Sequence, residues 1–336
     1  MSSPFISDGR SVSWIMHQVL LALLPVVAVA SALYGTAVLI QLTLASVTAW
    51  AAEALVLRLR GYPLRPFLSD GSALITAWLL ALAIPPLAPW WVVVTGCAFA
   101  MIVAKHLYGG LGQNLFNPAM VGFAVLLISF PAAMTHWPAP LATGSGLSEP
   151  AWQASVIFGL IGSSPSDALS MATPLDALKT GLRDETTVAA LLAQPLFALP
   201  GPLALNLAAL LGGLYLLARG IIRWQIPLAC VATLGLLALL GQALDPARLA
   251  PPLFHLLTGA TLLGAFFVAT DSVTAPASPR GQLIYGAGIG ALIYAIRSWG
   301  NYPDAIAFAV LIANTAVPLL DAHTRPPVFG HREPPP

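Results

Sequence analysis

In the stretch Asp167-Ala-Leu-Ser-Met-Ala-Thr-Pro-Leu-Asp176, hydroxyl and carboxylate side chains gather inside the one long connection between two blocks of apolar sequence. Ser170 and Thr173 are three residues apart, with small Ala172 between them. Pro174 disfavours helical backbone at Thr173. A hydroxyl on such a turn is open to chemical modification; the alternative is a plain turn that ends one element and begins the next.

The rest of the chain is too apolar for a water-soluble protein. Of its 336 residues, 58% are hydrophobic and 8% are charged, and the mean hydropathy is +0.83. A soluble domain carries about a quarter charged residues, so this surface needs a lipid bilayer around it. We therefore predict an all-α polytopic membrane protein. The net charge of +1 gives no electrostatic reason to expect nucleic acid as a partner.

Apolar runs recur along both blocks, and a run of roughly 17–25 residues is long enough to cross a bilayer. We predict about ten membrane-spanning helices, near 14–34, 36–57, 72–88, 90–106, 116–133, 203–219, 225–243, 253–270, 282–298 and 303–321. Pro85-Pro86 and the glycine- and asparagine-rich stretch 109–118 interrupt this pattern, so some helices are predicted to be broken. Irregular backbone at membrane depth needs protein or a cavity around it, so these breaks point to an internal site.

The spans divide into two groups of five. The predicted segments are a first five-helix membrane repeat at 1–133, a loop at 134–202 that contains the stretch 167–176, a second five-helix repeat at 203–325 and a tail at 326–336. A short internal similarity relates Gly122-Phe-Ala-Val-Leu-Leu-Ile-Ser129 to Ala307-Phe-Ala-Val-Leu-Ile-Ala-Asn314. Because an odd number of crossings inverts the second copy, we expect inverted repeats, which in transport proteins place sites at the repeat interface.

Lysine and arginine are unevenly distributed between the two sides. With a cytoplasmic N-terminus, most of them fall inside: Arg10, Arg58, Arg60, Arg65, Lys105, Arg219, Arg223, Arg280, Arg325 and Arg332. Only Arg248 and Arg297 lie in short outer loops, and long loops cross largely regardless of their charge. We therefore expect a bacterial inner-membrane protein with both termini cytoplasmic and the 134–202 loop in the periplasm.

Several polar side chains lie at the ends of predicted spans. Thr270 and Asp271 end one apolar run, with Arg280 close by, and Asp70 precedes another. An acid and hydroxyls at a helix end can bind an ion or a polar ring; the alternative is a capped, charge-paired helix end.

Three more residues are candidates for a cavity or an ion path. Lys105 and Asn117 flank the broken stretch between two spans, where such groups face a cavity or cap a helix. Glu53 lies inside an apolar run, and an ionisable group there is a candidate for ion passage. The alternative is that Glu53 reaches the membrane interface, since Arg58 is little more than one helical turn away.

Other features we interpret as structural. The run Gly286-Ala-Gly288-Ile-Gly290 follows no strand and lies in an apolar span, so it indicates close helix packing and not a dinucleotide site. Asp304 is predicted to pair with Arg297. Cys97 and Cys230 each lie alone in an apolar run, which indicates buried side chains and no cysteine-rich metal site.

The stretch around Thr173 resembles the acceptor motif of flavin transferases, Asp-x-x-Ser-x-Ala-Thr. The matching residues are Asp167, Ser170, Ala172 and Thr173, with Met171 where related motifs often have glycine. Continued through Lys179-Thr-Gly, the stretch resembles a loop of the RnfD and NqrB family of membrane subunits. A second block, 266–276, resembles the family's Phe-x-Ala-Thr-Asp-Pro-Val-Thr signature, with Ser272 in place of the usual proline.

The resemblance implies ten spans and an FMN that is joined through its phosphate to Thr173. It also implies a noncovalent riboflavin near the polar cytoplasmic span ends. The protein is then a subunit of an ion-translocating ferredoxin:NAD oxidoreductase (Rnf) complex, and it relays electrons coupled to the movement of Na⁺ or H⁺ without being catalytic alone. The implied partners are the other Rnf subunits (A, B, C, E and G) and a flavin transferase.

Two alternatives stay open. One is an NqrB-like subunit of the sodium-pumping NADH:quinone oxidoreductase, and the other is an inverted-repeat transporter without a redox role. Covalent flavin on the denatured chain separates the flavoprotein interpretations from the transporter.

Overall fold

The computed structural model describes residues 11–141, 149–160, 170–302 and 304–324. Within these ranges the chain is all-helical apart from one isolated β-bridge, between Pro138 and Ser170. Five helices are long and apolar enough to cross a membrane: Val12–Tyr34, Ala37–Leu59, Pro195–Ala218, Gln225–Leu244 and Ile306–His323. Shorter apolar helices cover Ser72–Ala83, Trp90–His106 and Pro118–Ser129. The prediction of an all-helical membrane protein is thereby confirmed.

The first block forms one side of the helix bundle. Its elements are α1 (Val12–Tyr34), α2 (Ala37–Leu59), α3 (Leu64–Leu68), α4 (Ser72–Ala83), α5 (Trp90–Phe99), the π-helix η1 (Ala100–His106) and α6 (Pro118–Ser129). As predicted, the double proline interrupts the third span, because α4 ends at Ala83, just before Pro85-Pro86.

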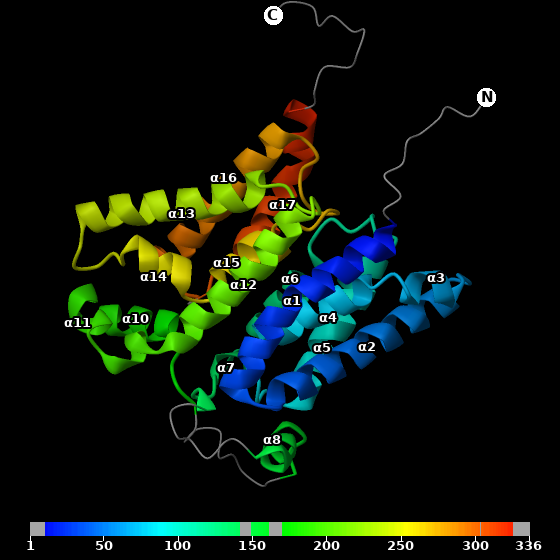
Figure 1. Cartoon of the computed structure of the whole chain (residues 1–336), viewed down its shortest axis with the longest axis horizontal. Coiled ribbons are helices and arrows are strands. Elements are labelled where there is room, and N and C mark those ends of the chain that lie inside the picture. The colour runs from blue at the N-terminus through cyan, green and yellow to red at the C-terminus, as the bar shows by residue number, and fades with distance from the viewer. Residues whose placement is uncertain (1–10, 142–148, 161–169, 303, 325–336) are drawn as a thin grey trace, which may run out of the picture.

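The connection between the blocks contains short helices. They are α7 (Pro131–Thr135), α8 (Pro150–Ile157), α10 (Pro174–Arg183), α11 (Val188–Leu192) and the 3-10 helix η3 (Pro195–Ala198). In Figure 1, α8, α10 and α11 gather at one end of the bundle, whereas α3 and the end of α17 lie toward the other.

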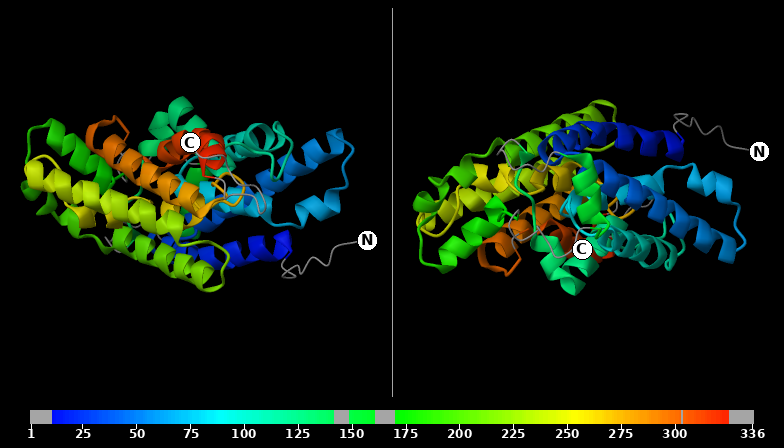
Figure 2. Two further views of the ribbon diagram at one scale, coloured as in Figure 1. Left: turned by 90° about the horizontal axis from the view of Figure 1, so that it is seen from above. Right: turned by 90° about the horizontal axis from the view of Figure 1, so that it is seen from below.

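The second block forms the opposite side. It consists of α12 (Pro200–Ala218), α13 (Gln225–Leu244), α14 (Pro252–Leu257), α15 (Thr261–Leu263), the π-helix η4 (Gly264–Val268), α16 (Pro279–Trp299) and α17 (Ile306–His323). The run predicted as one span at 253–270 is therefore three pieces, α14, α15 and η4. The two views of Figure 2 show α1–α5 on one side and α12–α16 on the other; the two sides meet where α1 packs on α12 and where α6 packs on α17.

Small residues let α13 and α16 approach closely. A Cβ atom on Gly286 would lie 2.6 Å from the Ile226 carbonyl oxygen, and one on Gly290 would lie 2.4 Å from that of Cys230. Both distances are shorter than any real contact, so each position requires glycine. The prediction that this run serves helix packing is confirmed, although Gly288 has no neighbour within 4 Å.

Candidate functional site

Thr173 is the N-cap of helix α10. Its backbone is extended (φ −66°, ψ 155°), as expected before a proline, and its hydroxyl oxygen accepts a hydrogen bond from the Asp176 N–H at 3.3 Å. Pro174 occupies the first helical position. An N–H at that position has no carbonyl partner within the helix, so proline costs no hydrogen bond there. The hydroxyl therefore lies at the positive end of a 10-residue helix.

The residues of the predicted acceptor motif differ in exposure. Ser170 and Ala172 are exposed and Thr173 is half-buried. Ser170 forms the antiparallel bridge with Pro138, which ties the motif to the segment that follows α7. Asp167 lies outside the described residues.

Helix α10 is fixed to the connection between α16 and α17. Lys179 Nζ donates to the carbonyl oxygens of Ile296 and Tyr302, at 3.3 and 2.6 Å, and Arg183 donates to Asn301 Oδ1 at 3.2 Å. Burial of the Lys179 ammonium, together with the nearby Arg183 guanidinium, lowers the pKa of Lys179 to about 8.

The apolar face of α10 is buried as well. Leu175 and Leu178 pack in a small cluster with Val188 and Leu191 of α11 and with Phe254 of α14. This cluster is separate from the main core, so α10 is held by its own apolar contacts as well as by the polar ones. Together these contacts fix the position of Thr173 relative to the second block.

A cavity of about 230 Å³ opens beside Thr173, and we call it the Thr173 cavity. Both blocks contribute to its wall, which is mostly apolar and aromatic and includes Tyr34, Phe123, Trp137, Leu263 and Ile306. Polar side chains on the same wall are Thr135, Thr173, Asp176, Asn206 and Asp304. Such a mostly apolar space with a few polar groups is the usual form of an organic cofactor site.

An ion pair lies at this wall, with its arginine buried and its aspartate half-buried. Arg297 Nη2 is 3.3 Å from Asp304 Oδ1, and Arg297 Nη1 donates to the His255 carbonyl oxygen at 2.7 Å. The predicted pairing of Asp304 with Arg297 is confirmed. Because Asp304 lines the Thr173 cavity, the pair fixes one carboxylate of the wall with its charge compensated.

Asn206 is a functional candidate that sequence reasoning missed. Its side chain accepts from the Leu262 N–H at 3.1 Å and donates to the carbonyl oxygens of Leu257 and Gly259, at 3.0 and 2.9 Å. It thereby holds the irregular backbone between α14 and α15 at the edge of the Thr173 cavity. The only signal in the sequence is one amide side chain inside the apolar run of α12.

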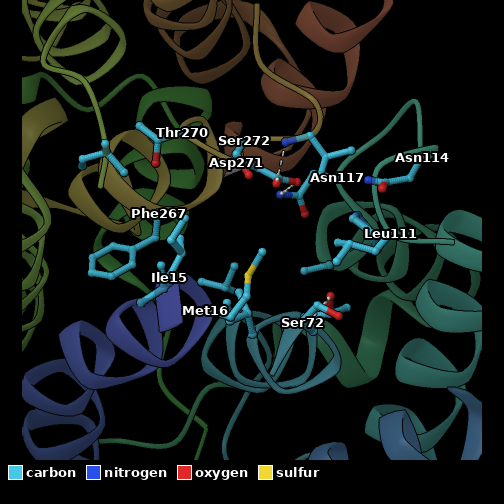
Figure 3. A pocket seen from close by; sticks show the side chains of 18 of the residues that line it. Ile15, Met16, Ser72, Leu111, Asn114, Asn117, Phe267, Thr270, Asp271 and Ser272 are labelled. Carbon is cyan, nitrogen blue, oxygen red and sulfur yellow. Dashed lines mark hydrogen bonds between the residues drawn. The ribbon is translucent and has the colours of Figure 1, made fainter. Parts of the chain in front are cut away.

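A second, smaller cavity of about 100 Å³ lies between the blocks, and we call it the Asn117 cavity. Asn117 caps α6 by accepting from the Met120 N–H, and its Nδ2 lies 3.4 Å from both Asp271 Oδ2 and the Val268 carbonyl oxygen. Figure 3 shows Asn117 beside Asp271, with Ser72 across the cavity from them.

Two charged residues meet beside the Asn117 cavity. Lys105 Nζ is 2.6 Å from Glu53 Oε1 and 2.7 Å from Ser72 Oγ. Asp70 Oδ1 accepts from the N–H and from the hydroxyl of Ser72, each at 2.7 Å. Glu53 is 1% exposed, and its charged partner is Lys105.

The residues singled out in the sequence thus fall into two groups. Thr173 lines one cavity, whereas Lys105, Asn117, Thr270 and Asp271 line the other. Glu53 and Asp70 join the second group through Lys105 and Ser72. Across the ranges that the structure covers, no group of three or more His, Cys, Asp and Glu side chains is placed to hold a metal ion.

Known proteins resemble the chain over its whole length. The model of the NQR2, RnfD, RnfE family matches residues 1–330. A Cronobacter sakazakii protein, named as the D subunit of an ion-translocating oxidoreductase complex, is 51% identical over 349 residues, which cover 98% of each chain. The proteins of the same name from Aeromonas hydrophila and Escherichia fergusonii are 50% and 49% identical, over 98% and 99% of this chain and 98% of each relative. Both cavities fall within the matched residues, and the chain belongs to the NQR2, RnfD, RnfE family.

Proposed function

We propose that this chain is the D subunit of an Rnf-type ion-translocating oxidoreductase complex and that it carries FMN on Thr173. In this role it relays electrons between ferredoxin and NAD, coupled to the movement of Na⁺ or H⁺. The observation that carries the proposal is the placement of the Thr173 hydroxyl, at the start of α10 and on the wall of a cavity between the two blocks. The relatives named as D subunits agree with it.

The surroundings of Thr173 suit a phosphoester. The first-turn N–H groups of α10 point toward the N-cap, and the helix dipole favours negative charge there. The hydrogen bond from the Asp176 N–H to the Thr173 hydroxyl oxygen is long, at 3.3 Å. Little hydrogen-bond energy is therefore lost when that oxygen becomes the ester oxygen. The Asp176 carboxylate in that turn opposes a phosphate, and the N-terminal N–H groups offset this repulsion.

The Thr173 cavity suits the flavin ring. Tyr34, Phe123 and Trp137 supply aromatic surface, and Asn206 and Asp304 supply polar groups for ring nitrogens and oxygens. A bound flavin supplies one- and two-electron redox chemistry, which the side chains of this chain lack. The chain's own part is to hold the ring, exclude water and fix its orientation through the docking of α10.

A noncovalent riboflavin is proposed for the other cavity. Asn117, Thr270 and Asp271 line it and offer amide, hydroxyl and carboxylate groups to a polar ring. Lys105 lines it too, and we assign Lys105, Glu53 and Asp70 to the cation path.

We further propose ten membrane crossings in two inverted five-helix repeats, with the segments 1–133, 134–202, 203–325 and 326–336 as predicted. One support is that each block contains a short apolar helix that follows a left-handed glycine, Gly71 at φ +84° and Gly259 at φ +62°. Each block also contains a π-helical segment. The proposed orientation in the bacterial inner membrane keeps both termini cytoplasmic and the loop with Thr173 periplasmic.

The proposed partners are the other Rnf subunits (A, B, C, E and G), a flavin transferase that modifies Thr173, and the lipid bilayer. The exposed leucines on the long helices, among them Leu21, Leu39, Leu211 and Leu236, support contact with lipid or with neighbouring subunits.

The test is flavin fluorescence of the chain on a denaturing gel, after coexpression with its transferase. The wild-type band is expected to fluoresce because a phosphoester survives denaturation, and Thr173→Ala is expected to be dark. The matched control is Thr187→Ala, since Thr187 is also an N-cap threonine in the connection, at the start of α11, and accepts from the Ala190 N–H at 3.4 Å.

A fluorescent Thr173→Ala band, or a dark Thr187→Ala band, would contradict the assignment. A dark wild-type band would favour a transporter without a redox role. Quinone reduction by the purified complex, with no ferredoxin:NAD activity, would favour the NqrB-like alternative.

A further inference from the structure

Gln153 is a buried amide on α8, in the connection between the two blocks. It is 1% exposed, and its side chain contacts the turn between α1 and α2. Thr36 Oγ1 and the Ala37 N–H both donate to Gln153 Oε1, each at 2.7 Å. Gln153 Nε2 donates to the Tyr34 carbonyl oxygen at 3.0 Å. A buried amide without partners costs free energy, so these three hydrogen bonds fix the side chain and the turn together.

The turn between α1 and α2 fits this amide closely. Gly35 has φ +76°, a backbone conformation that favours glycine. A Cβ atom at Gly35 would lie 2.6 Å from Gln153 Nε2, closer than any real contact. The amide is held by three hydrogen bonds and would lose them by moving aside. Glycine is therefore required at this position by the backbone and by the amide.

Gln153 holds a residue of the wall of the Thr173 cavity. Of the described residues, Tyr34 and Trp137 line that cavity and Gln153 does not. The centroids of the Tyr34 and Trp137 rings are 6.2 Å apart, with the ring planes at 59°. Because the Tyr34 backbone is held at its carbonyl group, the position of its ring depends on the turn. Gln153 therefore acts on the cavity through Tyr34.

Trp137 is tied to the stretch of backbone that leads to Thr173. Its carbonyl oxygen accepts from the Met171 N–H at 2.8 Å, and Pro138 forms the β-bridge with Ser170. One continuous series of contacts thus runs from α8, through the α1–α2 turn and two aromatic rings, to the residues just before Thr173. A group joined to Thr173 meets these two rings in fixed positions.

We propose that Gln153 is a positioning residue for the flavin ring. By holding the α1–α2 turn, it keeps Tyr34 packed against Trp137, and these two rings form the surface on which the isoalloxazine lies. Without the three hydrogen bonds, the turn is released and the Tyr34 ring leaves the cavity wall. The inference deepens the proposed function, on which it rests for the presence of FMN on Thr173.

The flavin fluorescence of the native protein reports on this contact. A phenol or indole that touches an excited flavin donates an electron to it and takes the electron back without emission of light, so the contact quenches the fluorescence. Denaturation separates the rings and restores the emission. The ratio of native to denatured emission therefore measures the contact with Tyr34 and Trp137, and a loss of stability that leaves both rings in place does not change it.

The test uses the full chain, coexpressed with its transferase and purified in detergent, and compares its emission before and after denaturation. Emission from any flavin that is not on Thr173 is measured in Thr173→Ala and subtracted. Gln153→Met removes all three hydrogen bonds at similar side-chain size. Thr36→Val removes one of them from the other partner, and it is the milder variant because the Thr36 side chain makes no cap bond to α2.

We expect Gln153→Met to raise the ratio at least about threefold over wild type, because the loss of three net hydrogen bonds favours the released turn. Thr36→Val is expected to raise the ratio in the same direction by less. Tyr34→Leu removes one quenching ring directly and should raise the ratio as well. The double variant Gln153→Met/Tyr34→Leu should match Tyr34→Leu alone, because Gln153 acts through that residue.

Two control variants should keep the wild-type ratio. Gln194→Met changes an exposed glutamine of the same connection, whose side chain makes no cap bond to η3. Trp91→Leu removes an aromatic ring that packs on Phe130, with the centroids 4.8 Å apart, and Trp91 is not among the described residues that line the Thr173 cavity.

An unchanged ratio in Gln153→Met, or in Thr36→Val where Gln153→Met does not fold, would overturn the inference. A double variant whose ratio exceeds that of Tyr34→Leu would overturn it too. The denatured wild-type chain reports on the attachment itself. A dark denatured chain contradicts the proposed function, whereas a fluorescent one with a ratio that is insensitive to Gln153 contradicts only the role of Gln153.

Discussion

The two cavities differ in size, in chemistry and in how the chain builds them. The Thr173 cavity, about 230 Å³, is mostly apolar and aromatic, and among its polar groups Asp304 is ion-paired, Thr173 caps a helix and Asn206 is hydrogen-bonded to backbone. The Asn117 cavity, about 100 Å³, collects carboxylate, amide, hydroxyl and ammonium groups, and several of their contacts are long or incomplete. The first has the features of a rigid holder for a ring, and the second has those of a place where charge is exchanged.

The largest expected effect is on stability, and it concerns the charge pair of Glu53 and Lys105. Lys105→Met leaves the Glu53 carboxylate buried without a partner, which should lower the free energy of unfolding by about 3–5 kcal/mol. The double variant Lys105→Met/Glu53→Gln removes both charges and should return to within about 1 kcal/mol of wild type. Denaturant titration of the detergent-solubilised protein, in sodium-free buffer, measures both. Equal losses in the single and double variants would mean that the pair is not electrostatically coupled.

An intermediate effect compares one asparagine from each cavity. Asn206→Ala leaves the backbone groups of Leu257, Gly259 and Leu262 without their partner and should cost about 2 kcal/mol. Asn117→Ala removes a helix cap and two contacts of 3.4 Å, so about 1 kcal/mol is expected. The same titration ranks the two. The reverse order would show that the Asn117 cavity, and not the Thr173 cavity, is the rigid one.

The smallest effect is a difference in lysine reactivity between the two regions. Burial lowers the pKa of Lys179 from its ordinary value of 10.5 to about 8, so half of its amine is neutral, and therefore nucleophilic, at about pH 8. Acylation followed by peptide mapping should give a midpoint near pH 8 at Lys179 and no reaction at Lys105 in sodium-free buffer. A Lys179 midpoint near 10.5 would show that α10 is not docked on the α16–α17 connection as described.

The features that could be predicted are those whose residues lie close together in the sequence. Apolar runs of bilayer length predicted the helices, and the double proline after α4 predicted its early end. Thr173 could be proposed because its motif occupies one short stretch, and Arg297 and Asp304 could be paired because they are only seven residues apart.

The rest depends on contacts between distant segments. Nothing in the sequence pairs Glu53 with Lys105, since 52 residues and three further helices separate them. The role of Asn206 depends on irregular backbone more than 50 residues away, at 257–262. The run at 253–270 is apolar enough to be predicted as a single span, so its hydropathy did not indicate the division into α14, α15 and η4. The broken backbone there is stable because Asn206 and Thr261 supply hydrogen bonds to it.

The most direct test of the central claim is the mass of the peptide that contains Thr173, from protein purified out of its native membrane. The account predicts that this peptide is heavier by one FMN less one water and that fragmentation places the added mass on Thr173. A Thr173 peptide recovered entirely at its unmodified mass would contradict the account, whatever the state of the Asn117 cavity.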